Sequence, residues 1–394
     1  MQYTFADRVS GFQASDVREL LKVTQQREII SLGGGLPAPE LFPVKEIMAT
    51  SRKVLAEEGM RALQYSATEG HTPLRDWIAD RMNQMNGTHL NRDQILITSG
   101  SQQGLDLTGK IFLNKDDVVI CESPTYLAAI TAFRTYECSF REVAADEDGM
   151  LPQALEQALK ETPKAKFIYV VTNFQNPTGR TWRLERRQML YQLAKRYQVV
   201  IVEDNPYGEI RFEGEDIPPV HSMDQAGLAI SLGTFSKTFC PGYRIGWIAA
   251  SPEVIEKYIL AKQGSDLHTN TLAQMELHRY LQDYNIDTHI AKIKDVYLRR
   301  RDLAVETMLR VFPEQVTFTR PEGGLFLWVT LPAHVNARDV LAASLERGVA
   351  FVPGASFFPN GGHENTMRIN FSNTREDLLV KALETIGQLL HQFI

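Results

Sequence analysis

Short apolar runs alternate with longer amphipathic stretches over residues 94–263. Each run has the length of a strand, and most are followed by a turn of small or polar residues and then by apolar positions at helical spacing. This alternation is typical of a mainly parallel sheet with helices on both faces. The predicted strands cover residues 94–98, 117–121, 166–171, 199–203, 230–232 and 245–250.

The pattern changes after a long helical stretch predicted over residues 287–309. Shorter strands and two helices follow, which indicates a smaller α+β domain. A chain of 394 residues also exceeds the usual size of one core. We therefore expect an N-terminal arm with part of the small domain (1–43), a large domain (44–285) and a small C-terminal domain (286–394), with a short helix at 16–24 in the arm.

Polar side chains follow three of the predicted strands. Asn176, Asp204 and Lys237 come shortly after the runs that end near residues 171, 203 and 232. A lone lysine is usually a solvated charge, but one among hydroxyl residues beyond a buried strand is a candidate Schiff-base amine. Ligands of open α/β sheets bind outside the carboxyl ends of the strands. An amine, a carboxylate and an amide donor in that place suit pyridoxal phosphate.

Three segments in this order carry a resemblance to a known family. They are Asn-Pro-Thr-Gly at 176–179, Asp-x-x-Tyr at 204–207 and Thr-Phe-Ser-Lys at 234–237. From about residue 12 to its end, the chain resembles the fold-type-I pyridoxal-phosphate aminotransferases of class I/II. Within them it is most similar to the 2-aminoadipate and kynurenine/2-aminoadipate aminotransferases. The resemblance implies the aspartate-aminotransferase-like α/β fold, with a seven-stranded, mainly parallel sheet in the large domain.

The resemblance also implies roles for individual residues. Lys237 would form the internal aldimine and move the substrate proton, and Asp204 would hold the ring nitrogen of the cofactor. Tyr207, with Asn176, would hydrogen-bond the phenolic oxygen of the cofactor. Cofactor-binding residues would be Ser101, Gln102, Tyr126, Asn176, Asp204, Tyr207, Thr234, Ser236, Lys237, Arg244 and, from a neighbouring subunit, Tyr65. Substrate-binding residues would be Arg368, Asn176, Gly35, Arg18 and Tyr126. The peptide bonds 123–124 and 176–177 are implied to be cis.

Two of these arginines have alternative interpretations. Arg368 alternates with apolar residues on a predicted strand, where a buried guanidinium requires either a carboxylate of the protein or one of the substrate. Arg18 lies on the predicted helix 16–24, where it is either a solvated surface charge or, by resemblance, a partner for the distal carboxylate of an acidic substrate. Residues 99–105 likewise form either an ordinary helix cap or a phosphate site at a helix N-terminus.

Composition narrows the class of protein. Apolar residues make up 43% and charged residues 23% of the chain, which is ordinary for a globular enzyme. The net charge of −6 argues against nucleic acid or an anionic membrane as a partner. Three cysteines without metal-ligand spacing indicate free thiols, a reducing compartment and no metal site. No signal peptide or membrane-spanning run is evident, so we expect a cytoplasmic protein.

These observations predict a transaminase that moves the amino group of an L-amino acid to a 2-oxo acid, 2-oxoglutarate by expectation. The donor would be of 2-aminoadipate, aromatic or branched-chain type, and the enzyme would be a homodimer with shared active sites. A C–S β-lyase with the same cofactor is the first alternative. An aminotransferase-like transcription regulator is the second, but it requires a basic winged-helix segment ahead of the resemblance, which begins by about residue 12.

Overall fold

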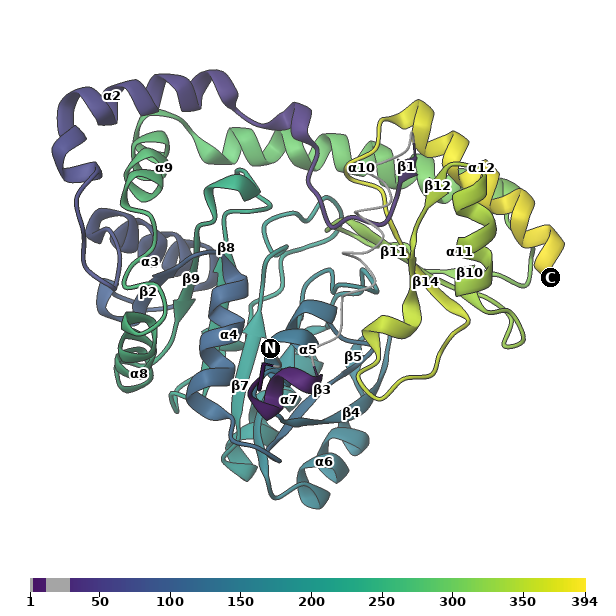
Figure 1. The fold of residues 1–394 in the computed structure, drawn as a ribbon, viewed down its shortest axis with the longest axis horizontal. Helices are drawn as coiled ribbons and strands as arrows, with labels where there is room; N and C mark the ends of the chain where they lie inside the picture. Colours follow the sequence, from purple (N-terminus) through teal and green to yellow (C-terminus); the bar gives the residue numbers. More distant parts are fainter. Residues whose placement is uncertain (1–2, 12–28) are drawn as a thin grey trace.

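The computed structural model describes residues 3–11 and 29–394 of the chain (Figure 1). The helix predicted over residues 16–24, including Arg18, lies outside these residues. One sheet of eight strands and one of four organise the described part. The predicted division of the chain at 43/44 and 285/286 stays a prediction.

The larger sheet has the strand order β2-β9-β8-β7-β6-β3-β4-β5. Its strands are β2 (Ile95–Thr98), β3 (Val118–Ser123), β4 (Ser139–Asp146), β5 (Gly149–Met150), β6 (Ala165–Val170), β7 (Val200–Asp204), β8 (Ala229–Thr234) and β9 (Gly246–Ala249). From β4 through β3, β6 and β7 to β8 the neighbours are parallel, whereas β9 is antiparallel to both β8 and β2. The prediction of a mainly parallel sheet is confirmed. To the expected seven strands, β5 adds an eighth by a two-residue antiparallel pairing with β4.

The hydrophobic pattern did not indicate every element. Strand β4 carries Arg141 and Glu142, and only Val143 of its eight residues is fully buried. A strand so near the sheet edge needs no continuous apolar run, which is why the pattern missed it. The helix α9 (Thr271–Asp283) was also not predicted; it packs against α2 (Val44–Ala62).

Both faces of the large sheet are covered by helices. Along β6, Phe167 and Tyr169 enter one apolar core, while Ile168 and Val170 enter the other. The second core also contains residues of α6 (Pro152–Glu161) and α7 (Leu184–Tyr197). The first contains residues of α3 (Thr72–Asn86), α4 (Ser101–Phe112), α5 (Leu127–Arg134) and α8 (Pro252–Gln263). Because both faces are buried, the central strands read as continuous apolar runs.

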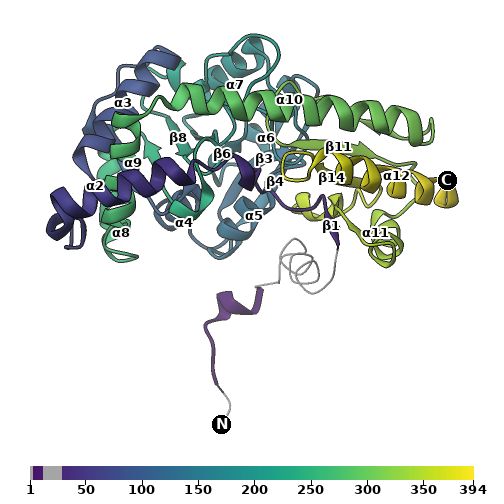
Figure 2. The ribbon, with the colours of Figure 1, turned by 90° about the horizontal axis from the view of Figure 1, so that it is seen from above.

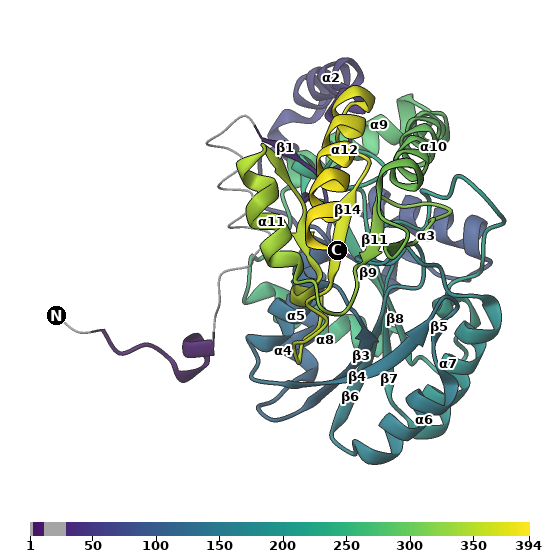
Figure 3. The same ribbon diagram turned by 90° about the vertical axis from the view of Figure 1, so that its right-hand side faces the viewer.

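The second sheet has the order β10-β11-β14-β13. It consists of β10 (Thr317–Phe318), β11 (Phe326–Thr330), β14 (Thr366–Asn370) and β13 (Val352–Pro353), and α11 (Ala337–Glu346) and α12 (Glu376–Phe393) lie beside it (Figure 3). Residues 349–353 are divided between two sheets, because β12 (Val349–Ala350) pairs in parallel with β1 (Ile30–Ser31), whereas β13 pairs with β14. The N-terminal segment is therefore held by the C-terminal part of the chain.

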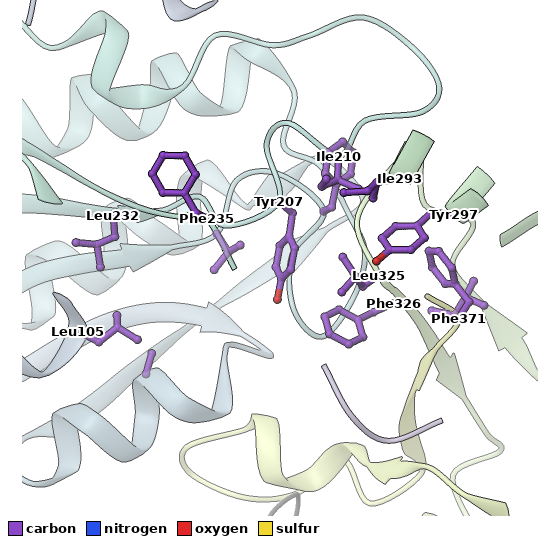
Figure 4. Packing of buried hydrophobic residues seen from close by; sticks show 14 of the residues in the cluster. Leu105, Tyr207, Ile210, Leu232, Phe235, Ile293, Tyr297, Leu325, Phe326 and Phe371 are labelled. Carbon is purple, nitrogen blue, oxygen red and sulfur yellow. The ribbon is translucent and has the colours of Figure 1, made fainter. Parts of the chain in front are cut away.

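The long helix α10 (Ile286–Val311) runs along both parts of the molecule (Figure 2). Its Ile293 and Tyr297 belong to the apolar core that also contains Tyr207, beyond β7, and Phe326 of β11 (Figure 4). The Tyr297 hydroxyl accepts a hydrogen bond of 3.0 Å from the backbone N–H of Ala38. One continuous core therefore joins the two sheets and the N-terminal segment around the carboxyl ends of β6, β7 and β8. No helix within residues 3–11 and 29–394 combines the length and apolar character needed to cross a bilayer.

We predict that Gly246→Ala destabilises the protein, because a Cβ at this position would lie 2.7 Å from the backbone nitrogen of Ser101. Strand β9 and the start of α4 would have to separate, at a cost of about 1–3 kcal/mol for such overpacking. The thermal midpoint measured without added ligand should fall. Gly242→Ala is the matched control, because its Cβ would meet nothing within 4 Å. Equal midpoints for the two variants would contradict this close approach.

Candidate active site

A cavity of about 450 Å³ opens between the two sheets, at the carboxyl ends of β6, β7 and β8. Of the predicted site residues within the described part of the chain, all except Tyr65 line it. The lining residues are Gly35, Ser101, Gln102, Tyr126, Leu127, Ala128, Thr131, Val171, Asn176, Asp204, Pro206, Tyr207, Thr234, Ser236, Lys237, Pro241, Arg244 and Arg368. Residues up to 333 positions apart in the sequence, from Gly35 to Arg368, therefore meet at one place.

Lys237 lies three residues beyond β8, where the strand gives way to a turn. Its Nζ donates a hydrogen bond of 2.7 Å to the backbone oxygen of Gly35. Burial, together with the positive charges of Arg368 and Arg244, lowers the pKa of Lys237 to about 8. The neutral, nucleophilic form of this amine is therefore far more populated near physiological pH than it is for an ordinary lysine.

Asp204 ends β7 and is almost fully buried. Its Oδ2 accepts a hydrogen bond of 2.9 Å from the hydroxyl of Tyr169 on the adjacent strand β6. Within the described part of the chain, Oδ1 has no hydrogen-bond partner. Burial raises the pKa of Asp204 to about 7, although the Tyr169 hydrogen bond acts in the opposite direction. A cationic N–H donor placed against Oδ1 would offset this cost, which is what a protonated pyridine nitrogen offers.

Arg368, on β14 of the second sheet, contacts Asn176, which lies in the loop after β6 of the large sheet. Its Nη1 donates to Oδ1 of Asn176 at 2.7 Å, and its Nη2 donates to the backbone oxygen of Gly33 at 2.6 Å. The guanidinium carbon lies 4.3 Å from the ring centre of Phe326 and 5.0 Å from that of Phe357. Burial lowers the pKa of Arg368 to about 10. No described carboxylate pairs with it, which leaves the substrate interpretation of this arginine.

Asn176 also connects to Tyr207. The Nδ2 of Asn176 donates to the Tyr207 hydroxyl over 3.4 Å. Burial raises the pKa of Tyr207 well above its usual value, so the phenol stays protonated and can donate. An amide N–H and a phenol O–H therefore converge on one side of the cavity, where they suit an anionic oxygen.

The other end of the cavity suits a phosphate. Helix α4 begins there at Ser101, and its first N–H groups are free of intrahelical partners by geometry. Gly100 has φ +78°, and a Cβ at this position would lie 2.4 Å from Nη2 of Arg244. The guanidinium therefore lies directly against the start of the helix. The hydroxyls of Thr234 and Ser236, 2.9 Å apart, complete a set of donors of the kind that binds phosphate.

Two predicted site residues are not placed in the cavity. Tyr65 is 80% exposed, and its ring meets the edge of His268 at a centroid distance of 5.9 Å. Arg18 lies outside the described residues. Both peptide bonds implied to be cis, Ser123–Pro124 and Asn176–Pro177, are cis.

Tyr169, Phe326 and Phe357 were not among the predicted site residues. Tyr169 carried a weak signal, because it places a polar hydroxyl in the otherwise apolar run of β6. The two phenylalanines carried none, since each reads as an ordinary core residue. Only the packing of β11 and of the turn after β13 against Arg368 brings them to the site.

Comparison with known proteins gives a consistent result. The family model "Aminotransferase class I and II" matches residues 27–386. An aromatic-amino-acid aminotransferase of Thermococcus litoralis is 43% identical over 98% of this chain and 94% of its own length. A crystal structure of Pyrococcus horikoshii kynurenine aminotransferase in complex with PMP aligns with a TM-score of 0.94 at 40% identity, covering 98% of this chain and 97% of its own.

A third relative is the α-aminoadipate aminotransferase of Thermus thermophilus, whose structure holds N-(5′-phosphopyridoxyl)-L-leucine. It aligns with a TM-score of 0.93 at 38% identity, over 99% of this chain and 97% of its own. Both similar structures contain a phosphopyridoxyl group, and the donors in the cavity described above fit such a group. The free Asp204 oxygen, the lysine with its lowered pKa and the donors at the start of α4 each have a counterpart in its chemistry.

We predict that the cofactor-free protein reacts covalently with pyridoxal phosphate at a rate that rises with pH to a midpoint near 8. Only the neutral amine attacks the aldehyde, and the pKa of Lys237 is lowered to about 8. Borohydride trapping followed by mass spectrometry measures the rate. The label is followed in the peptide that contains position 237, and Lys237→Ala should give no label in that peptide at any pH. Arg368→Leu should move the midpoint upward, because one of the charges that disfavour the ammonium is removed; identical midpoints near 10 in both proteins would contradict the assignment.

Proposed function

Because the chain belongs to the class I and II aminotransferases and is a pyridoxal-phosphate-dependent transaminase, we propose that it uses 2-oxoglutarate as the amino acceptor. We further propose an L-amino acid of 2-aminoadipate, aromatic or branched-chain type as the donor. One observation carries the assignment of the site. A partly buried lysine, a buried carboxylate with a free oxygen and a buried arginine without a carboxylate partner share one cavity in the described structure.

Different residues move the substrate proton and interact with the cofactor ring. When bound, the cofactor supplies an aldehyde carbon for the amino group and a ring that takes up electron density. Lys237 carries the proton at Nζ that leaves the substrate Cα. Asp204, held by Tyr169 at Oδ2, accepts the hydrogen bond of the ring nitrogen at Oδ1. This carboxylate keeps the nitrogen cationic, so that electron density moves toward the ring.

Asn176 and Tyr207, which contact each other in the cavity, would donate to the phenolic oxygen of the cofactor, and Tyr126 would pack against its ring. Ser101 and Gln102 at the start of α4, with Thr234, Ser236 and Arg244, hold its phosphate. These donors fix the cofactor at both ends of the cavity.

Arg368 orients the substrate through its α-carboxylate. A guanidinium presents a planar fork of donors that matches a carboxylate, and Phe326 and Phe357 hold the plane of this one. Gly35, whose backbone oxygen contacts Lys237, lies next to the substrate. The cavity lining also includes the uncharged residues Leu127, Ala128 and Thr131, which supports a site that accepts apolar donor side chains.

The substrate range follows from the relatives and from Arg18. The similar proteins are named for aromatic, kynurenine and 2-aminoadipate substrates, and the structure named for α-aminoadipate holds a phosphopyridoxyl-leucine. These names support a donor range that includes both apolar and acidic side chains. We propose that Arg18 binds the distal carboxylate of acidic substrates. For neutral substrates a buried, unpaired guanidinium is costly, so Arg18 must then leave the pocket.

A donor screen with 2-oxoglutarate tests this function. Glutamate should form from 2-aminoadipate, an aromatic amino acid and leucine. Arg18→Ala should lower kcat/KM for 2-aminoadipate, glutamate and 2-oxoglutarate by about ten- to a hundredfold, the equivalent of roughly 1.5–3 kcal/mol for a charged hydrogen bond. The half-reaction with leucine is the internal control and should be nearly unchanged. Release of pyruvate and ammonia without amino transfer would identify a lyase instead, and equal losses for all donors would assign Arg18 a structural role.

We also propose a cytoplasmic homodimer with shared active sites. Tyr65 is exposed next to exposed Leu63 and Met60, in a segment that a second subunit would cover. Its hydroxyl would then reach the cofactor phosphate of that subunit.

Hybrid dimers of Tyr65→Phe and Lys237→Ala chains test the shared site. Each hybrid should contain one site with both native residues, because Lys237 and Tyr65 of that site come from different chains. Activity at low cofactor concentration should therefore exceed that of either parent dimer. Hybrids no more active than the Tyr65→Phe parent would show that Tyr65 serves its own subunit or none.

A further inference from the structure

Glu122 is a buried carboxylate that the proposed chemistry does not use. It lies near the end of β3, and only 2% of it is exposed. Its Oε2 accepts a hydrogen bond of 2.9 Å from the backbone N–H of Val171, and its Oε1 accepts one of 2.8 Å from the indole N–H of Trp182. A charge is rarely buried in this way unless its hydrogen bonds hold something in place.

The two donors mark the ends of the loop that carries Asn176. Val171 is the first residue after β6, and Trp182 lies two residues before α7. The backbone N–H of Trp182 donates to the oxygen of Thr172 at 2.9 Å, so the ends of the loop also pair with each other. The carboxylate of Glu122 therefore contacts both ends of the segment 171–182.

The tip of the same loop is connected to the turn that follows Glu122. The Gln175 side-chain amide donates to the backbone oxygen of Pro124 at 2.9 Å. Thr178 donates in turn to the Gln175 side-chain oxygen at 2.5 Å. Tyr126, the residue directly before α5, follows Pro124 by two positions. The segment that carries Tyr126 and the loop that carries Asn176 are thus joined by the hydrogen bond between Gln175 and Pro124.

Only a hydrogen-bond acceptor suits the position of Glu122. Its contacts are N–H donors from Val171, Trp182 and Gln175, and burial raises its pKa to about 7 while these donors act in the opposite direction. A side-chain amide in place of this carboxylate would direct its N–H group at one of the existing N–H donors, and that donor would lose its hydrogen bond. Leaving a buried donor unpaired costs more than losing an exposed hydrogen bond. The loop ends would then shift, and Asn176 with them.

We propose that Glu122 is a positioning residue for Asn176: by fixing both ends of the loop 171–182, it holds the Asn176 side chain between Arg368 and the phenolic oxygen of the cofactor. Asn176 Oδ1 accepts from Arg368 at 2.7 Å, so a displaced Asn176 also displaces the guanidinium that binds substrate. The inference rests on the role proposed above for Asn176.

The test is the pH at which the absorbance of the bound cofactor changes. Hydrogen-bond donors to the phenolic oxygen favour the deprotonated form of the chromophore, because the deprotonated form has more negative charge on this oxygen. Asn176→Ala should therefore raise the midpoint. Glu122→Gln, which keeps the size of the side chain, should raise it in the same direction by about half a pH unit or more, a part of the shift that one charged hydrogen bond gives.

A matched control and a double variant separate positioning from general damage. Glu142→Gln makes the same change on the adjacent strand β4, where the carboxylate accepts from the Ser123 hydroxyl at 2.9 Å, and it should leave the midpoint unchanged. Glu122→Gln in the Asn176→Ala background should add no further shift, because the residue through which it acts is gone. Trp182→Phe, which removes one donor and leaves the carboxylate, should shift the midpoint less, and it carries the test if Glu122→Gln does not fold.

Each result decides the matter. If Asn176→Ala shifts the midpoint but Glu122→Gln and Trp182→Phe do not, the inference about Glu122 is wrong while the role of Asn176 stands. If the shift caused by Glu122→Gln persists in the Asn176→Ala background, Glu122 acts by another route and the inference is again overturned. If Asn176→Ala itself gives no shift, both the proposed role of Asn176 and the inference fall.

Discussion

The cavity depends on charged groups that the protein buries without pairing them to each other. Lys237 donates to a backbone oxygen, Asp204 keeps one oxygen without a partner in the described structure, and Arg368 contacts an amide and a carbonyl. Burial is therefore the largest cause of the pKa shift of each group, and in each case the shift favours the neutral form. A ligand that brings the missing opposite charge or donor offsets these costs on binding, so the affinity for cofactor and substrate originates in the way the chain folds.

The surrounding structure holds these groups apart at fixed positions. Tyr169 orients Asp204 from the adjacent strand, and the rings of Phe326 and Phe357 pack against the Arg368 guanidinium. Glu122 lies one layer farther out and holds the loop of Asn176 by its ends. The packed strands and loops therefore prevent Asp204, Arg368 and Asn176 from moving to positions where their own energy would be lower.

Much of the fold and of the site could be predicted from particular residues. The continuous apolar runs of β6, β7 and β8 were visible because both faces of those strands are buried, and the polar residues just beyond them indicated a shared edge. Strand β4, with its half-exposed and partly charged surface, gave no such signal. Tyr169 was not among the predicted site residues, because which strand neighbours Asp204 depends on the order of the strands in the sheet.

The sequence by itself determined the chemistry that is available: the lysine, carboxylate, amide and arginine, and the local strand-turn-helix units that place the first three at strand ends. The tertiary structure alone decided which of these groups meet and in what electrostatic state. Gly33, Gly35 and Arg368 reach the cavity from opposite ends of the chain, and the pKa of Lys237 depends on burial and on two arginines brought close to it. The physical reason is that hydrophobic periodicity is a local property, whereas desolvation and charge–charge interactions depend on distances that only the packed chain sets.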